Sequence, residues 1–373
     1  MKHQVLGIGI AGTELSALER SLLSDVRPYA VVLFARNVGT PEQLRKLVGE
    51  IKNGCDPSPL IMIDEEGGRV DRLRDLIPGI PAAEDYRNGE NGADLAEEAG
   101  RLVGEALDYF GIDVNLAPVV DVERAEPSKS LLRRCFGKSA AEVIELAGAF
   151  MRGQESAGVA SCLKHYPGLG PGAADPHHNE TIIDEDLAGI AEDLAPYRAL
   201  AKRAGAVMIG HQSYLGIDDR IPATLSRKIS TDILRREIGF EGIAVSDDME
   251  MHAVADLGPY PKIATQAIAA GNDVVLYCAY VEGVRDLAAA VEKRGEEDVA
   301  FGRRLAEAHE RGEAYREHCR LLQSGKTRRL PTFDALSSAV ADYHARFTEL
   351  RPDAAGPGPG TTAKGKTGRE EWT

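Results

Sequence analysis

The chain has 373 residues, of which 28% are charged and 43% are hydrophobic, and its formal net charge at pH 7 is −15. This length excludes a small disulfide-stapled domain, and the hydrophobic fraction excludes global disorder. The negative charge argues against a nucleic acid or an anionic membrane surface as partner, because both are themselves polyanions. No apolar stretch approaches the roughly 20 residues that span a bilayer, and no cleavable targeting segment is visible. We therefore expect a soluble protein that acts on a small molecule, and its oligomeric state stays open.

The cysteines indicate a reducing compartment. They are odd in number, widely scattered, and contain no Cys-x-x-Cys pair. Such a pattern fits neither a disulfide framework nor a zinc site, so we expect reduced thiols in a cytoplasmic protein. The five residues are Cys55, Cys135, Cys162, Cys278 and Cys319.

Short apolar segments alternate with longer segments of helical periodicity along the first 280 residues. The stretch 93–110 is typical, with apolar residues at helical spacing and Gly111 as the expected end of the helix. The expected strands are residues 5–10, 30–34, 60–64, 112–117, 159–164, 206–210, 242–246 and 273–278. The expected helices are residues 15–25, 41–52, 93–110, 140–157, 186–204, 228–238 and 263–270.

This order predicts an α/β fold, a (β/α)8 TIM-type barrel. Strands that are apolar on both faces and separated by helices favour parallel crossover units, and eight of them close a barrel. The alternative is an open doubly wound sheet, which the dinucleotide-like spacing Gly7-x-Gly9-x-x-Gly12 supports. However, the second expected strand ends in Ala35-Arg36, without an acidic ligand for a ribose. We therefore interpret the glycines as a glycine-rich first loop.

The C-terminal part of the chain differs in composition. It is helical and highly charged from about residue 281 to Leu322, and a last helix is expected over residues 333–350. Residues 351–373 are rich in Pro, Gly, Thr and Lys, which predicts a disordered tail. We therefore expect a catalytic domain over residues 1–325, a C-terminal helix within residues 326–350, and the tail.

Four expected strands end in ionisable side chains. In a TIM-type barrel the active groups lie at the carboxyl ends of the strands, so these side chains should meet at one mouth. Any one pair is usually a structural ion pair, but four converging sets are much less often so. The four sets are Asp64 to Arg72, Lys164-His165, His211, and Asp247-Asp248.

Such a set could cleave an acetal. A carboxylate such as Asp247 can attack or shield an anomeric carbon, while a second group protonates the departing oxygen. Asp175-x-His177 could supply that proton, because residues i and i+2 of an extended segment project to the same side and a carboxylate stabilises a charged imidazole. On spacing alone, a surface loop explains this pair equally well. The pair Lys164-His165 could likewise be structural, and Asp64 with Arg72 could be a local ion pair.

Several motifs in order along residues 5–280 resemble glycoside hydrolase family 3, specifically its single-barrel β-N-acetylglucosaminidases of bacterial cell-wall recycling (the NagZ type). They are Asp64-Glu65-Glu66-Gly67-Gly68-Arg69-Val70, Asn115-Leu116-Ala117-Pro118-Val119-Val120-Asp121, Arg134-Cys135-Phe136-Gly137, Lys164-His165-Tyr166-Pro167-Gly168, Pro222-Ala223-Thr224-Leu225-Ser226, Gly239-Phe240-Glu241-Gly242 and Ser246-Asp247-Asp248-Met249-Glu250-Met251.

The resemblance implies a retaining hydrolase that removes terminal β-linked N-acetylglucosamine. Asp247 would be the nucleophile, and His177, assisted by Asp175, would be the acid/base. The sugar would be held in the −1 subsite by Asp64, Arg72, Arg134, Lys164 and His165. The substrate would be a cell-wall muropeptide fragment or a small-molecule glycoside of a biosynthetic pathway, and no metal or organic cofactor is implied.

The catalytic loop departs from the family pattern. The family usually reads Lys-His-Phe-Pro-Gly-His-Gly and then Asp-Ser-His, whereas this chain has Leu169 for the second histidine and Pro176 for the serine. Proline fixes φ and removes a backbone donor, so the hydrogen bonding of the loop must differ. The family's Arg-Ser-Phe-Gly motif has Cys135 in place of its serine, and an unusual arginine, Arg133, precedes the motif. These changes affect the leaving-group side more than the sugar side.

Three other functions remain open on the sequence. A β-N-acetylglucosaminide phosphorylase would use the same intermediate with phosphate as acceptor, since a neutral imidazole does not repel phosphate as a carboxylate would. A catalytically silent sugar-binding barrel is disfavoured by the retained Asp247, Asp175 and His177. An aldolase or lyase would need Lys164 for a Schiff base.

Overall fold

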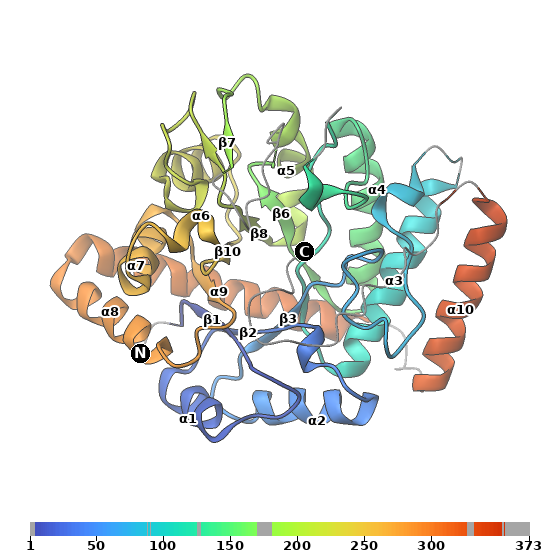
Figure 1. Ribbon diagram of the computed structural model, residues 1–373, viewed down its shortest axis with the longest axis horizontal. Helices are drawn as coiled ribbons and strands as arrows, with labels where there is room; N and C mark the ends of the chain where they lie inside the picture. Colours follow the sequence, from blue (N-terminus) through green and yellow to red (C-terminus); the bar gives the residue numbers. More distant parts are fainter. Residues whose placement is uncertain are drawn as a thin grey trace.

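The computed structural model describes residues 4–87, 89, 91–124, 128–169, 181–326, 332–352 and 354. A ring of short parallel strands lies at the centre, and helices surround it (Figure 1). The strands of the ring are β1 (Leu6–Gly9), β2 (Ala30–Leu33), β3 (Leu60–Ile63), β4 (Val114–Asn115), β5 (Ala160–Ser161), β6 (Leu163–Tyr166), β8 (Ala206–Ile209), β10 (Ile243–Asp248) and β11 (Val274–Tyr277). The helices are α1 (Ala17–Val26), α2 (Pro41–Lys52), α3 (Gly92–Phe110), α4 (Ala140–Ser156), α5 (Ala191–Ala204), η5 (Lys228–Glu237), α6 (His252–Ala255), α7 (Tyr260–Ala270), α8 (Val284–Glu297), α9 (Val299–Gly325) and α10 (Phe333–Leu350).

The strand order closes the sheet into the predicted barrel. Neighbours follow the order β5-β4-β3-β2-β1-β11-β10-β8-β6, and the ring pairs are parallel. The two ends of this order, β5 and β6, are consecutive pieces of one segment that is interrupted only at Cys162. The nine strands therefore occupy the eight positions of a (β/α)8 barrel, and the expected fifth strand is β5 together with β6.

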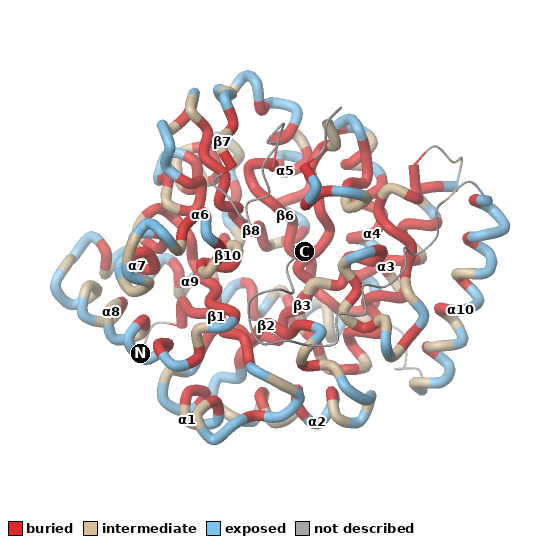
Figure 2. The backbone as a smooth tube through the Cα atoms, in the orientation of Figure 1, coloured by how far each residue is buried: buried red, intermediate tan, exposed pale blue. Residues whose placement is uncertain are grey.

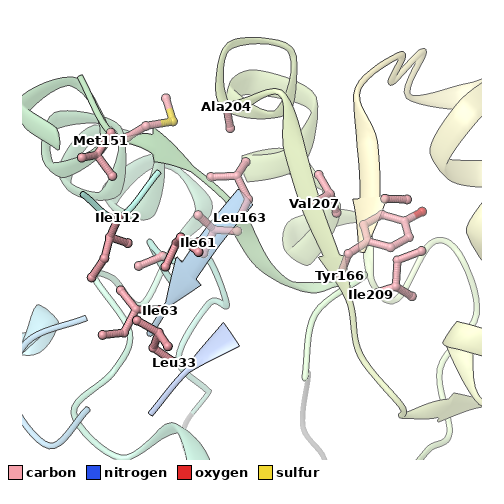
Figure 3. Close-up of a cluster of buried hydrophobic side chains, with 14 of the residues drawn as sticks. Leu33, Ile61, Ile63, Ile112, Met151, Leu163, Tyr166, Ala204, Val207 and Ile209 are labelled. Atoms are coloured by element: carbon pink, nitrogen blue, oxygen red, sulfur yellow. The ribbon is translucent and has the colours of Figure 1, made fainter. Parts of the chain in front are cut away.

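The barrel strands are buried on both faces. Along β3, Ile61 and Ile63 belong to a large apolar cluster that faces the helices, and Figure 3 shows them with Leu163 and Met151 in that layer. The alternate residues of β3, including Met62, belong to a second cluster that fills the barrel. Because successive side chains of a strand point to opposite faces, one short apolar run supplies both layers.

Helix α9 covers the amino ends of the strands. Its Tyr315 and Cys319 complete the cluster inside the barrel, and the Tyr315 hydroxyl donates to the Ser161 carbonyl oxygen at 3.1 Å. In Figure 1 this helix lies behind the strands, and Figure 2 shows that the strands are buried whereas the outer helices carry exposed surfaces. The amino end of the barrel is therefore plugged, which leaves the carboxyl end for the chemistry.

Gly7 and Gly9 allow close strand packing and do not form a nucleotide-binding turn. Both lie in β1, where a Cβ at Gly9 would be 1.9 Å from the Cys278 carbonyl oxygen beyond β11. Seven residues separate β1 from α1, which starts behind a capping box at Ser16. The open dinucleotide-binding sheet that we kept as an alternative is therefore wrong.

Several elements differ from the sequence-based expectation. The expected strand 112–117 is reduced to the two residues of β4, and the segment 228–237 is a π-helix, η5. A small parallel pair, β7 (Ile182–Ile183) with β9 (Ser213–Tyr214), was not anticipated. The pairing of β7 with β9 joins residues about 30 positions apart, and a π-helix differs from an α-helix only in the spacing of its hydrogen bonds, so hydrophobic periodicity predicts neither.

The C-terminal helix is present as predicted. Helix α10 packs on α3, where the Tyr343 hydroxyl donates to the Leu95 carbonyl oxygen at 3.0 Å. Arg351 at its end is buried and donates to the Arg87 carbonyl oxygen. The domain boundary at residue 325 stays a prediction, and the tail beyond residue 354 lies outside the described residues. In the part of the chain that is described, no helix combines the length and hydropathy needed to cross a membrane.

Candidate active site

The carboxyl end of β3 is held in place by Asn115 of β4. The Asn115 side chain accepts from Glu65 N at 2.9 Å and donates to Glu65 O at 2.8 Å. It also donates to Gln154 Oε1 of α4 at 2.8 Å. These bonds replace the strand ladder where β3 ends, and they fix the directions in which Asp64 and Glu66 leave the barrel.

Four of the side chains at this end form an alternating array of charges. Lys164 Nζ of β6 lies 2.6 Å from Asp64 Oδ1 and 2.6 Å from Glu66 Oε1. Arg134 then binds the Glu66 carboxylate through two hydrogen bonds of 2.8 Å each. We call Asp64, Glu66, Arg134 and Lys164 the Lys164 cluster. The cluster connects β3, β6 and the loop after β4 through charge-assisted bonds.

The mutual pairing keeps the Lys164 cluster ionised although it is buried. Burial by itself would raise the pKa of Glu66, but Arg134 and Lys164 outweigh it and hold the pKa well below the usual range of a glutamate. Burial would lower the pKa of Lys164, and the carboxylates of Asp64 and Glu66 raise it above its ordinary value. A fixed cation between fixed anions suits the recognition of sugar hydroxyls, since each group can donate or accept without changing its protonation state.

His165 is oriented by Asp121 from the loop after β4. Asp121 Oδ2 lies 2.8 Å from His165 Nδ1 and also accepts from the His165 backbone N at 3.2 Å. His165 Nε2 lies 3.4 Å from Arg134 Nη2. A proton on Nδ1 satisfies Asp121 and leaves Nε2 as an acceptor for Arg134, so the carboxylate selects the tautomer. The Lys164–His165 peptide bond is cis.

Arg72 lies at the edge of the Lys164 cluster. Its Nη2 is 3.9 Å from Asp64 Oδ2, and its backbone N donates to Glu65 Oε2 at 2.8 Å. Its Nε is buried and has no hydrogen-bond acceptor among the described residues. Arg72 therefore offers a spare donor beside Asp64.

Two of the departures from the family pattern lie together. Leu169 and Cys135 are buried in one small apolar cluster with Val119 and Leu131. Leu169 N also donates to Asp121 Oδ1 at 2.7 Å. The two changes therefore support each other: they replace polar groups by an apolar contact behind Asp121 and Arg134.

Asp247 leaves β10 at a β-bulge. The pairing of β10 with β11 shifts between Val245 and Asp248, and the Ser246 hydroxyl accepts the Leu276 N–H at 2.9 Å in place of a strand carbonyl. A bulge re-aims the side chains that follow it. Asp247 is half-buried there, and its Oδ1 accepts from Asp248 N at 2.8 Å.

Asp248 has a different environment from its neighbour. Its Oδ1 accepts from Glu250 N at 3.2 Å and from Cys278 N at 3.4 Å. Burial, and then the charges of Glu250 and Asp247, raise the pKa of Asp248 to about 8. Asp248 is thus mostly protonated at neutral pH, which spares the site a second carboxylate charge beside Asp247.

His211 supports the same segment from β8. It is buried, with Nε2 2.9 Å from the Asp248 carbonyl oxygen and Nδ1 2.6 Å from Thr224 Oγ1. The Thr224 hydroxyl in turn donates to the Gly210 carbonyl oxygen at 2.6 Å. His211 therefore ties the backbone that carries Asp247 and Asp248 to the end of β8.

Charged groups from both sides of the site affect the pKa of Cys162, which lies inside the barrel. Burial raises the pKa of Cys162 to about 12, and the carboxylates of Asp64 and Asp247 contribute to the rise whereas Lys164 opposes it. Because β3, β6 and β10 belong to one parallel sheet, Asp64 after β3 and Asp247 near the end of β10 lie at the same end of the barrel. All five cysteines are free thiols, as expected.

The described structure brings together Asp64, Arg72, Arg134, Lys164 and His165, and it places Asp247 at the same end of the barrel. Asp175, His177, His178 and Pro176 lie outside the described residues, so their placement stays a prediction. The candidate set omitted Glu66, Asp121, Asn115 and His211 as functional residues. The signal for Glu66, Asp121 and Asn115 was present, since all three stand in the quoted motifs, and His211 was already one of the ionisable strand ends. Within the described residues no group of His, Cys, Asp and Glu side chains could hold a metal ion.

Comparison with known proteins identifies the family. The family model described as the glycosyl hydrolase family 3 N-terminal domain matches residues 4–306. The chain belongs to glycosyl hydrolase family 3. This membership confirms the resemblance that the motifs indicated, and it agrees with the barrel and its charged carboxyl end.

Relatives within family 3 confirm the predicted enzyme class, a β-N-acetylhexosaminidase-like glycoside hydrolase. A β-hexosaminidase of Alkalilimnicola ehrlichii is 39% identical over 287 residues, which cover 75% of this chain and 82% of the relative. A β-hexosaminidase of Vibrio cholerae is 38% identical over 275 residues, 73% of this chain and 82% of the relative.

Solved structures of family 3 agree in fold. A β-N-acetylglucosaminidase from Paenibacillus sp. FPU-7 superposes with a TM-score of 0.83 at 29% identity, over 94% of this chain and 68% of that one. NagZ from Neisseria gonorrhoeae, solved with N-trifluoroacetyl-D-glucosamine, gives a TM-score of 0.73 at 26% identity, over 95% of this chain and 99% of that one.

The environment of Asp248 predicts a pH-dependent stability. The unfolded chain has an ordinary Asp248 pKa near 3.8, whereas the folded chain has a pKa of about 8. As pH rises, the unfolded state loses this proton first, so the free energy of unfolding falls from about pH 4 to about pH 8, by up to ~1.4 kcal/mol per pH unit. Asp248→Asn keeps a neutral side chain with Oδ1, and it should flatten this fall in denaturant titrations.

Asp219→Asn is the matched control, because Asp219 is exposed. It should leave the pH dependence as in the wild type. An unchanged slope in Asp248→Asn, with stability lowered equally at every pH, would mean that Asp248 is ionised in the folded chain.

Proposed function

We propose that this chain is a retaining exo-β-N-acetylglucosaminidase that removes terminal β-linked N-acetylglucosamine through a covalent glycosyl-enzyme. The observation that carries the proposal is the Lys164 cluster beside Asp247: fixed donors and acceptors for a sugar lie at the same barrel end as a half-buried carboxylate. The names of the relatives, β-hexosaminidase and β-N-acetylglucosaminidase, support the same sugar.

The sugar would be held by groups of both polarities. Asp64 and Glu66 can accept from hydroxyls, and Arg72 has a buried Nε–H available to donate. Arg134 and His165 lie within 3.4 Å of each other and would receive the 2-acetamido group. Because these side chains already pair with one another, they are pre-oriented and lose little conformational entropy on binding.

Asp247 would act as the nucleophile. Its carboxylate oxygen attacks the anomeric carbon while the bond to the leaving oxygen breaks, and a glycosyl ester forms. Water then attacks the same carbon, the ester bond breaks, and the sugar leaves with its original β configuration. The bulge at Ser246 and the neutral Asp248 support this role, because they re-aim Asp247 and leave its charge unopposed by a second carboxylate.

His177 would be the acid/base, with Asp175 as its partner. In the first step the imidazolium gives its proton to the leaving oxygen, and in the second step the neutral ring takes a proton from water. This assignment rests on the Asp175-x-His177 spacing and the family resemblance.

The alternatives differ in their support. Lys164 is charged and paired on two sides, and this does not favour a Schiff base, for which a neutral amine is needed. A phosphorylase would use the same site with phosphate as acceptor and stays open. Muropeptide fragments and biosynthetic glycosides are both possible substrates. The cytoplasmic location stays a prediction.

A panel of chromogenic β-glycosides that differ at C2 tests the function. The 2-acetamido sugar should be hydrolysed with a kcat/KM at least about a hundredfold above that for glucose, because the analogue leaves buried polar groups unpaired. The first product should be the β anomer by NMR. Equal efficiency on glucosides or an α product would contradict the proposal, and a phosphate-dependent rate with a sugar 1-phosphate product would select the phosphorylase.

Replacement of the nucleophile should stop the reaction without unfolding the chain. Asp247→Asn removes the attacking charge, and we expect kcat to fall by at least about 10³-fold. Asp219→Asn makes the same chemical change at an exposed position and should keep full activity. A 2-deoxy-2-fluoro glycoside should label the wild type at Asp247, and labelling at Asp248 or Asp64 would overturn the assignment.

Replacement of the acid should affect substrates according to their leaving group. His177→Ala should lower kcat/KM, which reports the first step, by about 10²–10⁴-fold for substrates with poor leaving groups but little for nitrophenyl glycosides, because nitrophenol departs without a proton. Asp175→Ala should show a weaker form of this pattern. His178→Ala is the matched control, and the selective pattern in that variant would move the role to His178.

A further inference from the structure

A second concentration of charge lies at the amino end of the barrel, away from the candidate active site. A cavity of about 490 Å³ is bordered there by η5, α8 and α9. Gly271, which lines it, lies just ahead of β11. No residue of the Lys164 cluster takes part in its lining.

The cavity is rich in arginine. Seven of its lining residues are arginines, three from η5 and the residue before it, one from α8 and three from α9, and two are carboxylates. Two further carboxylates, Asp232 and Asp273, pair with these arginines without lining the cavity. Three guanidinium charges therefore have no compensating carboxylate, on a chain whose net charge is −15.

Three of the arginines are fixed around the fully buried Asp273. Arg235 Nη2 lies 2.7 Å and Arg311 Nη1 lies 3.1 Å from its carboxylate, and Arg304 donates to it as well. Burial lowers the pKa of Arg235 to about 10, and although Asp273 opposes this, the charges of Arg311 and Arg304 add to the fall. Arg235 Nε is buried and finds no acceptor among the described residues. Glu307 also pairs with Arg304 at 3.5 Å and with Arg311 at 3.9 Å, so these three arginines share two carboxylates.

Two other arginines are available to a ligand. Arg227, just before η5, and Arg303, on α9, both line the cavity and are exposed. Neither side chain has a hydrogen bond or an ion pair to any other described residue. Exposed side chains without partners can move onto a ligand without first breaking another bond, whereas the arginines around Asp273 are already held in place.

We propose that this cavity binds a small molecule that carries a phosphate or diphosphate group. Guanidinium groups bind phosphate oxygens through two parallel hydrogen bonds, and the uncompensated charge favours a multivalent anion. The volume is in the range of small-molecule sites. The site is separate from the barrel mouth and does not depend on the proposed glycosidase function.

Calorimetric titration of the full chain with inorganic pyrophosphate at low ionic strength tests the proposal. We expect saturable binding of one pyrophosphate per chain. The double variant Arg227→Ala/Arg303→Ala should raise Kd at least about tenfold, because two charge-assisted contacts are lost. The control Arg20→Ala/Arg320→Ala makes the same change in net charge at exposed arginines elsewhere and should keep the wild-type Kd. Both double variants should keep glycosidase activity, which reports an intact fold.

Three results would overturn the proposal. The first is the absence of saturable binding, and the second is an equal loss of affinity in both double variants, which would indicate a general effect of charge. The third is displacement of pyrophosphate by N-acetylglucosamine, which would place the anion at the barrel mouth.

Discussion

The burial of the Lys164 ammonium between two carboxylates is the constraint on which the candidate site depends. A buried charge is costly unless it is paired, and Lys164 is paired twice, with Asp64 and Glu66 at 2.6 Å each. Arg134 then compensates the second carboxylate. Removal of any member leaves a buried charge with one charged partner fewer, so the four side chains act as a unit. This unit also connects the end of β3 to β6 through side chains at the barrel mouth.

At three places in the site, a side chain accepts the hydrogen bond of a backbone N–H that a neighbouring strand would otherwise satisfy. Asn115 satisfies the backbone of Glu65, Asp121 satisfies the backbone of His165, and Ser246 satisfies the backbone of Leu276. Each of these side-chain hydrogen bonds pairs one backbone N–H outside the strand ladder. The site is therefore built on rigid elements, and the side chains that satisfy the backbone at these strand ends set its geometry.

The two ends of the barrel use charge in different ways. At the carboxyl end the Lys164 cluster alternates in sign, so it can recognise a neutral sugar through many oriented hydrogen bonds. At the amino end three arginines share Asp273, and others nearby remain unpaired. Helix α9 serves both functions at that end: Tyr315 closes the barrel interior, and Arg304 and Arg311 shape the arginine-rich cavity. A neutral ligand at one end and an anionic ligand at the other would not compete.

The sequence determined the fold class, the order of the strands and most residues of the sugar side of the site. Apolar runs such as residues 60–64 are visible in the sequence itself. So are motifs such as Asp64-Glu65-Glu66 and Ser246-Asp247-Asp248. The pattern could not reveal which neighbour each ionisable group meets. Glu66 became a central residue only because the barrel brings the carboxyl end of β3 close to Lys164 of β6, and the neutral state of Asp248 follows from its burial beside Glu250.

Hydrophobic periodicity also failed to predict two elements and the second cavity. The segment 228–237 has helical periodicity but forms a π-helix, and β7 and β9 pair across about 30 residues. The arginines of the second cavity are spread over residues 227–311 and form no motif, so only the packing of η5, α8 and α9 brings them together. Residue types and periodicity are properties of the chain, whereas burial and the identity of each charged partner are decided by tertiary contact.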